Sequence, residues 1–128
     1  MRLLLDTCTF LWYTTGSPRL STAAKELVLD NDNELFLSAA SIWEIALKFA
    51  KGKLNLAEPP ATFVPFYRKQ GGIAVLELRE EAALYSASLP FHHHDPFDRM
   101  LVCQSIVHGL AILSPDPLLA QYPVRLLW

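Results

Sequence analysis

Four acidic residues stand where apolar segments end or where an apolar helix surrounds them: Asp6, Glu44, Asp98 and Asp116. A carboxylate is costly to bury unless positive charge neutralises it. If the four converge, they predict a bound divalent cation, because carboxylate oxygens suit hard cations better than zinc, which would want His or Cys. A divalent cation between carboxylates at neutral pH predicts the hydrolysis of phosphodiester bonds by an activated water.

The segments that would position these acids alternate between strand-like and helix-like patterns. Short apolar runs predict four strands, with a candidate fifth near the C-terminus: residues 3–5, 35–37, 73–76, 110–113 and 124–127. Helices are predicted over residues 8–13, 21–29, 39–51, 59 onward, 79–88 and 95–109, and Pro65 is expected to kink or shorten the fourth. Strands separated by helices imply right-handed crossovers and a mainly parallel α/β sheet of four or five strands.

This topology brings the acids together. Sites in parallel α/β sheets form beyond the carboxyl ends of the strands. Asp6 follows the first predicted strand directly, and Asp116 comes soon after the fourth. Glu44 lies in the apolar helix over 39–51, and Asp98 lies in the first turn of the helix that Asp95 opens, on the same face as apolar residues.

Each acid also has an ordinary structural explanation. Asp6 is placed to cap the following helix, and Asp116 belongs to a Pro-rich turn. Asp98 stands three residues after Asp95, as in a capping arrangement, although Glu or Gln is usual there. Glu44 is spaced to pair with Lys48 along one helix. A metal site is favoured only by the four acids taken together, because the predicted strands and helices would bring them to the same edge of the sheet.

Several other residues are candidates for a role near the acids. We expect Lys48, Arg99 and Ser114 to contact a substrate, with structural anchoring as the alternative for Arg99 and a solvated face as the alternative for Lys48. The run His92–His94 resembles a metal tract, but consecutive side chains do not aim at one ion, so a solvated loop is the better interpretation, with a role facing the substrate as the alternative. Cys8 and Cys103 form no CxxC pair and are expected to be reduced thiols buried on helices.

Length, composition and charge limit the kinds of protein that this chain can be. The 128 residues predict a single domain, 1–128, and a hydrophobic content of 52% suggests that part of the surface meets another protein chain. Without the four negative charges, the net charge of −2 becomes +2, so nucleic acid is not excluded. No apolar stretch approaches the ~20 residues that span a bilayer, and Asp6 interrupts the apolar start, so we expect a cytoplasmic protein without a membrane segment.

The chain resembles the PIN-domain ribonucleases and, among them, the VapC-type toxins of toxin–antitoxin pairs. The resemblance covers nearly the whole chain and rests on six blocks: Leu3 to Thr7, Ser38 to Ala46, Gly52 to Leu54, His94 to Leu101, Ser114 to Asp116 and Tyr122 to Val124. The Trp43-Glu44 and Asp95-Pro-Phe-Asp-Arg blocks are the specific ones. Cys8, where relatives of this branch often carry His, and Pro115 depart from the pattern without removing a carboxylate.

The resemblance implies a PIN-like three-layer α/β/α domain whose acidic quartet maps onto Asp6, Glu44, Asp98 and Asp116. It also implies a Mg²⁺- or Mn²⁺-dependent endoribonuclease that acts on RNA, forms a homodimer and is silenced by a cognate VapB-like antitoxin. Hydrolysis by water would leave a 5′-phosphate and a 3′-hydroxyl.

Other functions remain open at this point. A PIN-type nuclease of RNA processing, or a PIN-fold interaction domain without activity, would share the same pattern. A phosphoaspartyl enzyme is disfavoured because it needs a second carboxylate two residues after Asp6, where Cys8 stands. A receiver domain is disfavoured because Glu77 and Leu78, not an Asp, follow the third strand.

Overall fold

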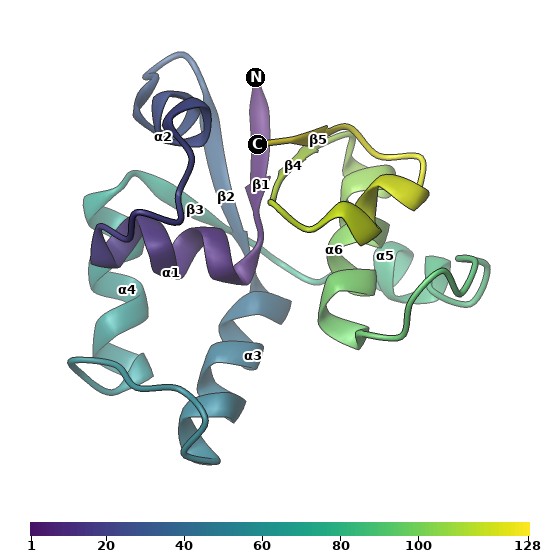
Figure 1. The fold of residues 1–128 in the computed structure, drawn as a ribbon. Helices are drawn as coiled ribbons and strands as arrows, with labels where there is room; N and C mark the ends of the chain where they lie inside the picture. Colours follow the sequence, from purple (N-terminus) through teal and green to yellow (C-terminus); the bar gives the residue numbers. More distant parts are fainter.

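The computed structural model describes residues 1–128 and contains one sheet of five parallel strands. In the order β3-β2-β1-β4-β5 across the sheet, the strands are β3 (Ile73–Leu76), β2 (Glu34–Ser38), β1 (Arg2–Leu5), β4 (Ala111–Leu113) and β5 (Leu126–Leu127). The order changes direction at β1, which pairs with β2 on one side and β4 on the other (Figure 1). The central strand therefore ends at the topological switch point, where sites of this fold class form.

The strands are short, and the central one is buried from Leu3 to Leu5 because helices cover both faces of the sheet. Leu3, Leu4 and Leu5 have no solvent-exposed surface, and the run is continuously apolar, as expected for a central parallel strand. Leu5 lies opposite Leu37 of β2 and Leu113 of β4. This register aligns the carboxyl ends of the three central strands.

The helices form the two outer layers around this sheet, so the predicted three-layer α/β/α fold is confirmed. Their bounds are α1 (Thr7–Thr15), α2 (Thr22–Leu29), α3 (Ala39–Ala50), α4 (Pro60–Gln70), α5 (Glu80–Tyr85), α6 (Pro96–His108) and the 3₁₀ turn η1 (Pro117–Gln121). Figure 1 shows α1, α2 and α4 on one side of the sheet and α5 and α6 on the other.

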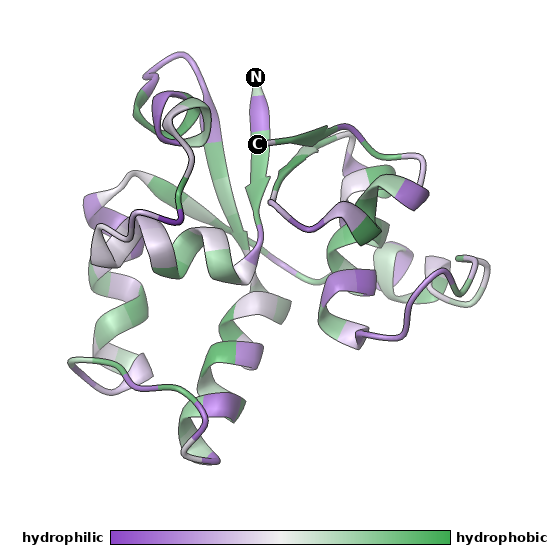
Figure 2. Ribbon diagram, in the orientation of Figure 1, coloured by the Kyte–Doolittle hydropathy of each residue, from purple (hydrophilic) through white to green (hydrophobic).

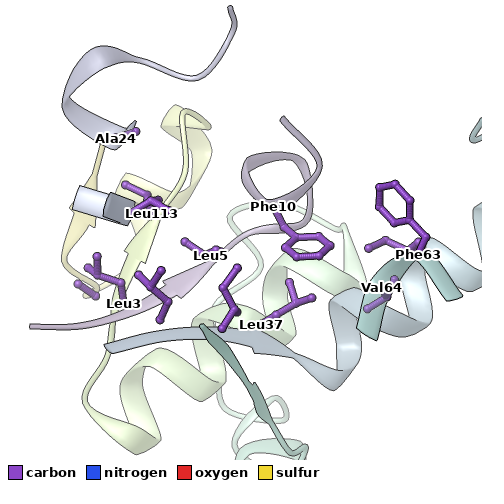
Figure 3. Packing of buried hydrophobic residues seen from close by; sticks show 13 residues of the cluster. Leu3, Leu5, Phe10, Ala24, Leu37, Phe63, Val64 and Leu113 are labelled. Atoms are coloured by element: carbon purple, nitrogen blue, oxygen red, sulfur yellow. The ribbon is translucent and has the colours of Figure 1, made fainter. Parts of the chain in front are cut away.

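Alternation of side chains along β1 supplies a core to each layer. Leu3 and Leu5 pack into the larger cluster with Phe10 of α1 and Val64 of α4 (Figure 3). Leu4 faces the opposite side and packs with Leu101 of α6. In Figure 2 the strands are mainly hydrophobic, whereas hydrophilic residues lie in the connections and on outer helix turns. No helix is long and apolar enough to cross a membrane.

Three segments differ from the sequence prediction. Helix α4 is not shortened at Pro65 but continues to Gln70. The backbone hydrogen bond that Pro65 cannot donate would have reached the carbonyl of Ala61, a residue exposed to water. Helix α5 ends at Tyr85 instead of 88, since the hydroxyls of Ser86 and Ser88 donate to backbone carbonyls in the closing turn. The turn η1 was not predicted at all.

Candidate active site

Asp6 lies at the end of the central strand and is the most firmly fixed of the four acids. Its backbone N–H donates to the carbonyl of Leu113, 3.2 Å away, which continues the β1–β4 ladder by one residue. Its Oδ1 accepts a hydrogen bond of 2.8 Å from the backbone N–H of Thr9, so the side chain also caps α1. The residue is only 4% exposed. The capping explanation is therefore correct, and the capping carboxylate is also close enough to Asp98 for its charge to act on that residue.

Glu44 projects from α3 towards the first turn of α1 and is 6% exposed. Its Oε1 accepts a 2.6 Å hydrogen bond from the Thr7 hydroxyl, and its Oε2 accepts from the Lys48 ammonium. The predicted i,i+4 pair exists, but the carboxylate end is buried while the Lys48 side chain is 47% exposed. Glu44 is thus held beside Asp6 by a hydroxyl and a cation that protein motion can withdraw.

Asp98 lies close enough to the other carboxylates for their negative charge to raise its pKa. It lies in the first turn of α6, where Asp95 caps the helix by accepting from the backbone N–H groups of Phe97 and Asp98. Burial, followed in order of effect by the carboxylates of Asp95, Asp6, Glu44 and Asp116, raises the pKa of Asp98 to about 7. Side chains from α1, α3, α6 and η1 therefore share one field of negative charge.

Asp116 occupies the outer edge of this group. It is half-buried, and its Oδ1 accepts a 2.9 Å hydrogen bond from the backbone N–H of Leu118, which makes it the cap of η1. Among the charges that raise the Asp98 pKa its effect is the smallest. Asp116 therefore belongs to a turn, as its structural explanation predicted. Its carboxylate is also close enough to Asp98 to raise the pKa of that residue.

The donor set fits a hard divalent cation better than any other group. All four side chains offer carboxylate oxygens, and a cation would relieve both the burial and the neighbouring negative charges that raise the pKa of Asp98. No three His, Cys, Asp or Glu side chains already lie close enough together to form a finished ligand set. One oxygen of Glu44 is already paired with the Lys48 ammonium.

Two of the three residues predicted to contact a substrate are in the interior. Arg99 is buried, and its guanidinium donates to the carbonyls of Leu89 and Pro90 while stacking 3.9 Å from the ring centre of Phe91. The structural alternative for Arg99 therefore describes it, and substrate contact does not. Ser114 is also buried, and its Oγ accepts the backbone N–H of Asp116. Lys48 alone has a head group that reaches both the acids and solvent.

Four residues near the acids were not recognised from the sequence as part of the site: Thr7, Cys8, His93 and Tyr122. The Cys8 thiol donates to both oxygens of Asp6, at 3.3 and 3.4 Å. Burial and the Asp6 charge raise the pKa of this thiol, so it acts as a neutral donor. Cys8 is half-buried and Cys103 is fully buried, and both are free thiols.

The prediction of a solvated loop for the histidine run is wrong for its middle residue. His92 and His94 are exposed, but the His93 side chain is 9% exposed and lies against Tyr122 and Asp98. The only available signal was the position of the run just before Asp95, and a run of three identical residues does not reveal which one turns inward.

Comparison with known families decides the classification. The family model described as the PIN domain matches residues 3–124. The chain belongs to the PIN-domain family. Its acidic group at the carboxyl ends of β1 and β4 is therefore the site on which a function must be argued for this PIN domain.

Two curated relatives are ribonucleases by name. Ribonuclease VapC16 of Mycobacterium tuberculosis is 40% identical over 65 residues, which is 48% of this chain and 46% of the relative. The chain thus matches about half the length of that protein. Ribonuclease VapC22 of the same organism is 25% identical over 115 residues, covering 89% of this chain and 86% of the relative.

Solved structures show the same fold. The chain resembles VapBC2 from Rickettsia felis bound to a promoter DNA fragment, with a TM-score of 0.75 and 13% identity over 99% of this chain and 98% of that one. DNA-bound VapBC from Salmonella typhimurium gives a TM-score of 0.72 and 16% identity over 99% and 97%. At such identities the likeness establishes the PIN fold.

The raised pKa of Asp98 predicts a pH-dependent stability. An unfolded Asp titrates near ~3.9, whereas folded Asp98 titrates near 7, so folding favours its protonated form. The stability contributed by this group is complete below pH ~4 and is lost as the pH rises to about 7. With metal ions chelated, Asp98→Asn should therefore unfold like wild type near pH 4 and be more stable by at least about 1 kcal/mol near pH 8.

Urea unfolding at several pH values measures this difference, and exposed Asp32→Asn is the matched control. A gap between Asp98→Asn and wild type that stays constant across the whole pH range would contradict the assigned charge field.

Proposed function

We propose that this PIN domain is a Mg²⁺- or Mn²⁺-dependent endoribonuclease and the toxin of a VapC-type toxin–antitoxin pair. The observation that carries the proposal is the convergence of Asp6, Glu44 and Asp116 on Asp98, at the carboxyl end of the central strand. The names of the two curated relatives supply the reaction class, and those of the solved VapBC complexes supply the kind of partner.

In this proposal Asp6, Glu44 and Asp98 hold the metal, and Asp116 contributes from the rim. A bound Mg²⁺ or Mn²⁺ would polarise the scissile phosphate and make a water nucleophilic at neutral pH. Thr7 and Cys8 hold the carboxylates of Glu44 and Asp6 in place by donating to them. Lys48, once released from Glu44, has the position and the charge to contact a backbone phosphate.

An aromatic pair beside the acids suits the bases of single-stranded RNA. Trp43, next to Glu44, is 63% exposed, and its ring packs edge-on against Phe97, next to Asp98, with 5.3 Å between ring centres. Stacking on exposed aromatic rings is how proteins hold unpaired bases without reading sequence. The pair therefore supports RNA as the substrate of the neighbouring acids.

An apolar groove supports a partner helix. It lies between α3 and α4 and is lined by Ile42, Ala46, Val64 and Val75, among others. An amphipathic helix fits such a groove by laying apolar side chains into it. We assign this groove to the antitoxin and propose a homodimer acting in the cytoplasm, where both RNA and a co-expressed antitoxin are found.

Removing a ligand charge should abolish cleavage and leave the fold intact. Asp6→Asn and Asp98→Asn keep the side-chain shape but weaken metal binding, so RNA cleavage should fall at least about 1,000-fold, as expected when several kcal/mol of metal catalysis are lost. Gel analysis of RNA fragments measures the rate, circular dichroism checks the fold, and Asp32→Asn serves as control. Near wild-type cleavage by either variant would remove the metal assignment.

The choice of cation gives an independent expectation. Mg²⁺ or Mn²⁺ should support cleavage, whereas Ca²⁺ should bind with little turnover, because its flexible coordination positions water poorly. The measurement is cleavage of the same RNA in each ion and in excess chelator. Full activity in chelator would point to a metal-free mechanism.

Toxicity separates the toxin from a PIN nuclease of RNA processing. Expression of the chain alone should arrest growth, and co-expression with the neighbouring small open reading frame should relieve the arrest. Growth curves with Asp98→Asn as the inactive control measure this. Harmless expression of an active nuclease would favour RNA processing, and harmless expression of an inactive one would favour an interaction domain.

A further inference from the structure

His93 differs from the two histidines beside it because its ring is built into the protein. The side chain is 9% exposed, whereas His92 and His94 are exposed. The Tyr122 hydroxyl lies 2.7 Å from His93 Nδ1 and 3.3 Å from the backbone nitrogen of the same residue. A tyrosine 29 positions later therefore fixes both the backbone and the ring of His93.

The hydrogen bonds of Tyr122 determine which ring nitrogen carries the proton. Its hydroxyl oxygen accepts from the backbone N–H of His93 and from Arg99, whose Nη1 is 3.3 Å away. Both of those groups are donors only, so the hydroxyl hydrogen has Nδ1 as its acceptor. A neutral imidazole that accepts at Nδ1 carries its hydrogen at Nε2.

The donor at Nε2 has no hydrogen-bond partner although it is buried. An unpaired buried donor costs free energy, and such a group in a native structure calls for an explanation. Asp98 Oδ2 lies 3.8 Å from it. A shift of about 1 Å, within the reach of a carboxylate rotation, brings the two atoms to hydrogen-bond distance.

We infer that His93 is a positioning residue for Asp98: its Nε2–H holds Oδ2 so that the other carboxylate oxygen is presented to the metal. The inference rests on the proposed function, because it assigns a role to His93 only if Asp98 is a ligand. Carboxylate ligands depend on such donors to fix their orientation. Asp6 and Glu44 already have theirs, from Thr9 and Thr7.

Arg99 supports this arrangement because it holds in place the segment that carries His93. Its guanidinium donates to the carbonyls of Leu89 and Pro90 at the start of this segment and to the Tyr122 hydroxyl at its far side. The residue next to Asp98 in sequence thus fixes the loop that supplies the donor to Asp98.

Metal affinity measured by calorimetry with Mn²⁺ tests the inference without using activity. His93→Ala should weaken Mn²⁺ binding about 10–100-fold, the usual effect of removing a group that orients a ligand. His93→Gln, whose amide N–H can replace Nε2–H, should recover most of that loss. His94→Ala is the matched control and should bind like wild type, because this ring stacks on Phe91, whereas the ring of His92 packs against Tyr122.

Three further outcomes are decisive. Ring nitrogen NMR of the metal-free protein should show the proton of His93 on Nε2, and a proton on Nδ1 would overturn the inference. A His93→Ala protein that melts earlier but binds Mn²⁺ with wild-type affinity would show a merely structural role and overturn it as well. Wild-type protein that binds no Mn²⁺ would instead remove the proposed function, and this inference with it.

Discussion

Repulsion between carboxylates that are partly withheld from water is the constraint around which this PIN domain is organised. Four acids from different parts of the chain face one region, and their field, added to burial, raises the pKa of Asp98 to about 7. Such an arrangement opposes folding, so the rest of the chain must supply the stability. The apolar run Leu3–Leu5 of the central strand and the apolar clusters on both faces of the sheet do so, because they bury every side chain of β1 except that of Arg2.

The protein offsets the repulsion unequally among the acids. Asp6 has a helix N-terminus and a thiol, Glu44 has a hydroxyl and an ammonium, and Asp116 has the N–H of Leu118. The Asp98 carboxylate accepts no such hydrogen bond, and Nε2 of His93 lies 3.8 Å from its Oδ2. Burial and the neighbouring carboxylates raise the pKa of this acid, so its surroundings disfavour the charged form.

The fold and the positions of the acids followed from the sequence because both depend on short-range rules. Apolar runs, Pro and Gly breaks and the Asp95-Pro96 start predicted the order of elements, and a parallel sheet then required Asp6 and Asp116 to share an edge. The errors were local. Pro65 does not shorten α4, because the donor it lacks would have served a carbonyl that water can reach, and serine hydroxyls close α5 early.

The contacts that decide the roles of Arg99 and His93 include Tyr122, which lies 23 and 29 positions later in the chain, and no sequence periodicity predicts them. Arg99 looked like a phosphate ligand because its charge is visible in the sequence, whereas the carbonyls of residues 89 and 90 that bind it are not. Likewise the inward turn of His93 needs the hydroxyl of Tyr122, which is placed by the unpredicted turn η1 just before it. In this PIN domain the positions of the four acids therefore follow from local sequence patterns, whereas the position of His93 beside Asp98 depends on the packing of Tyr122, near the C-terminus, against the loop before α6.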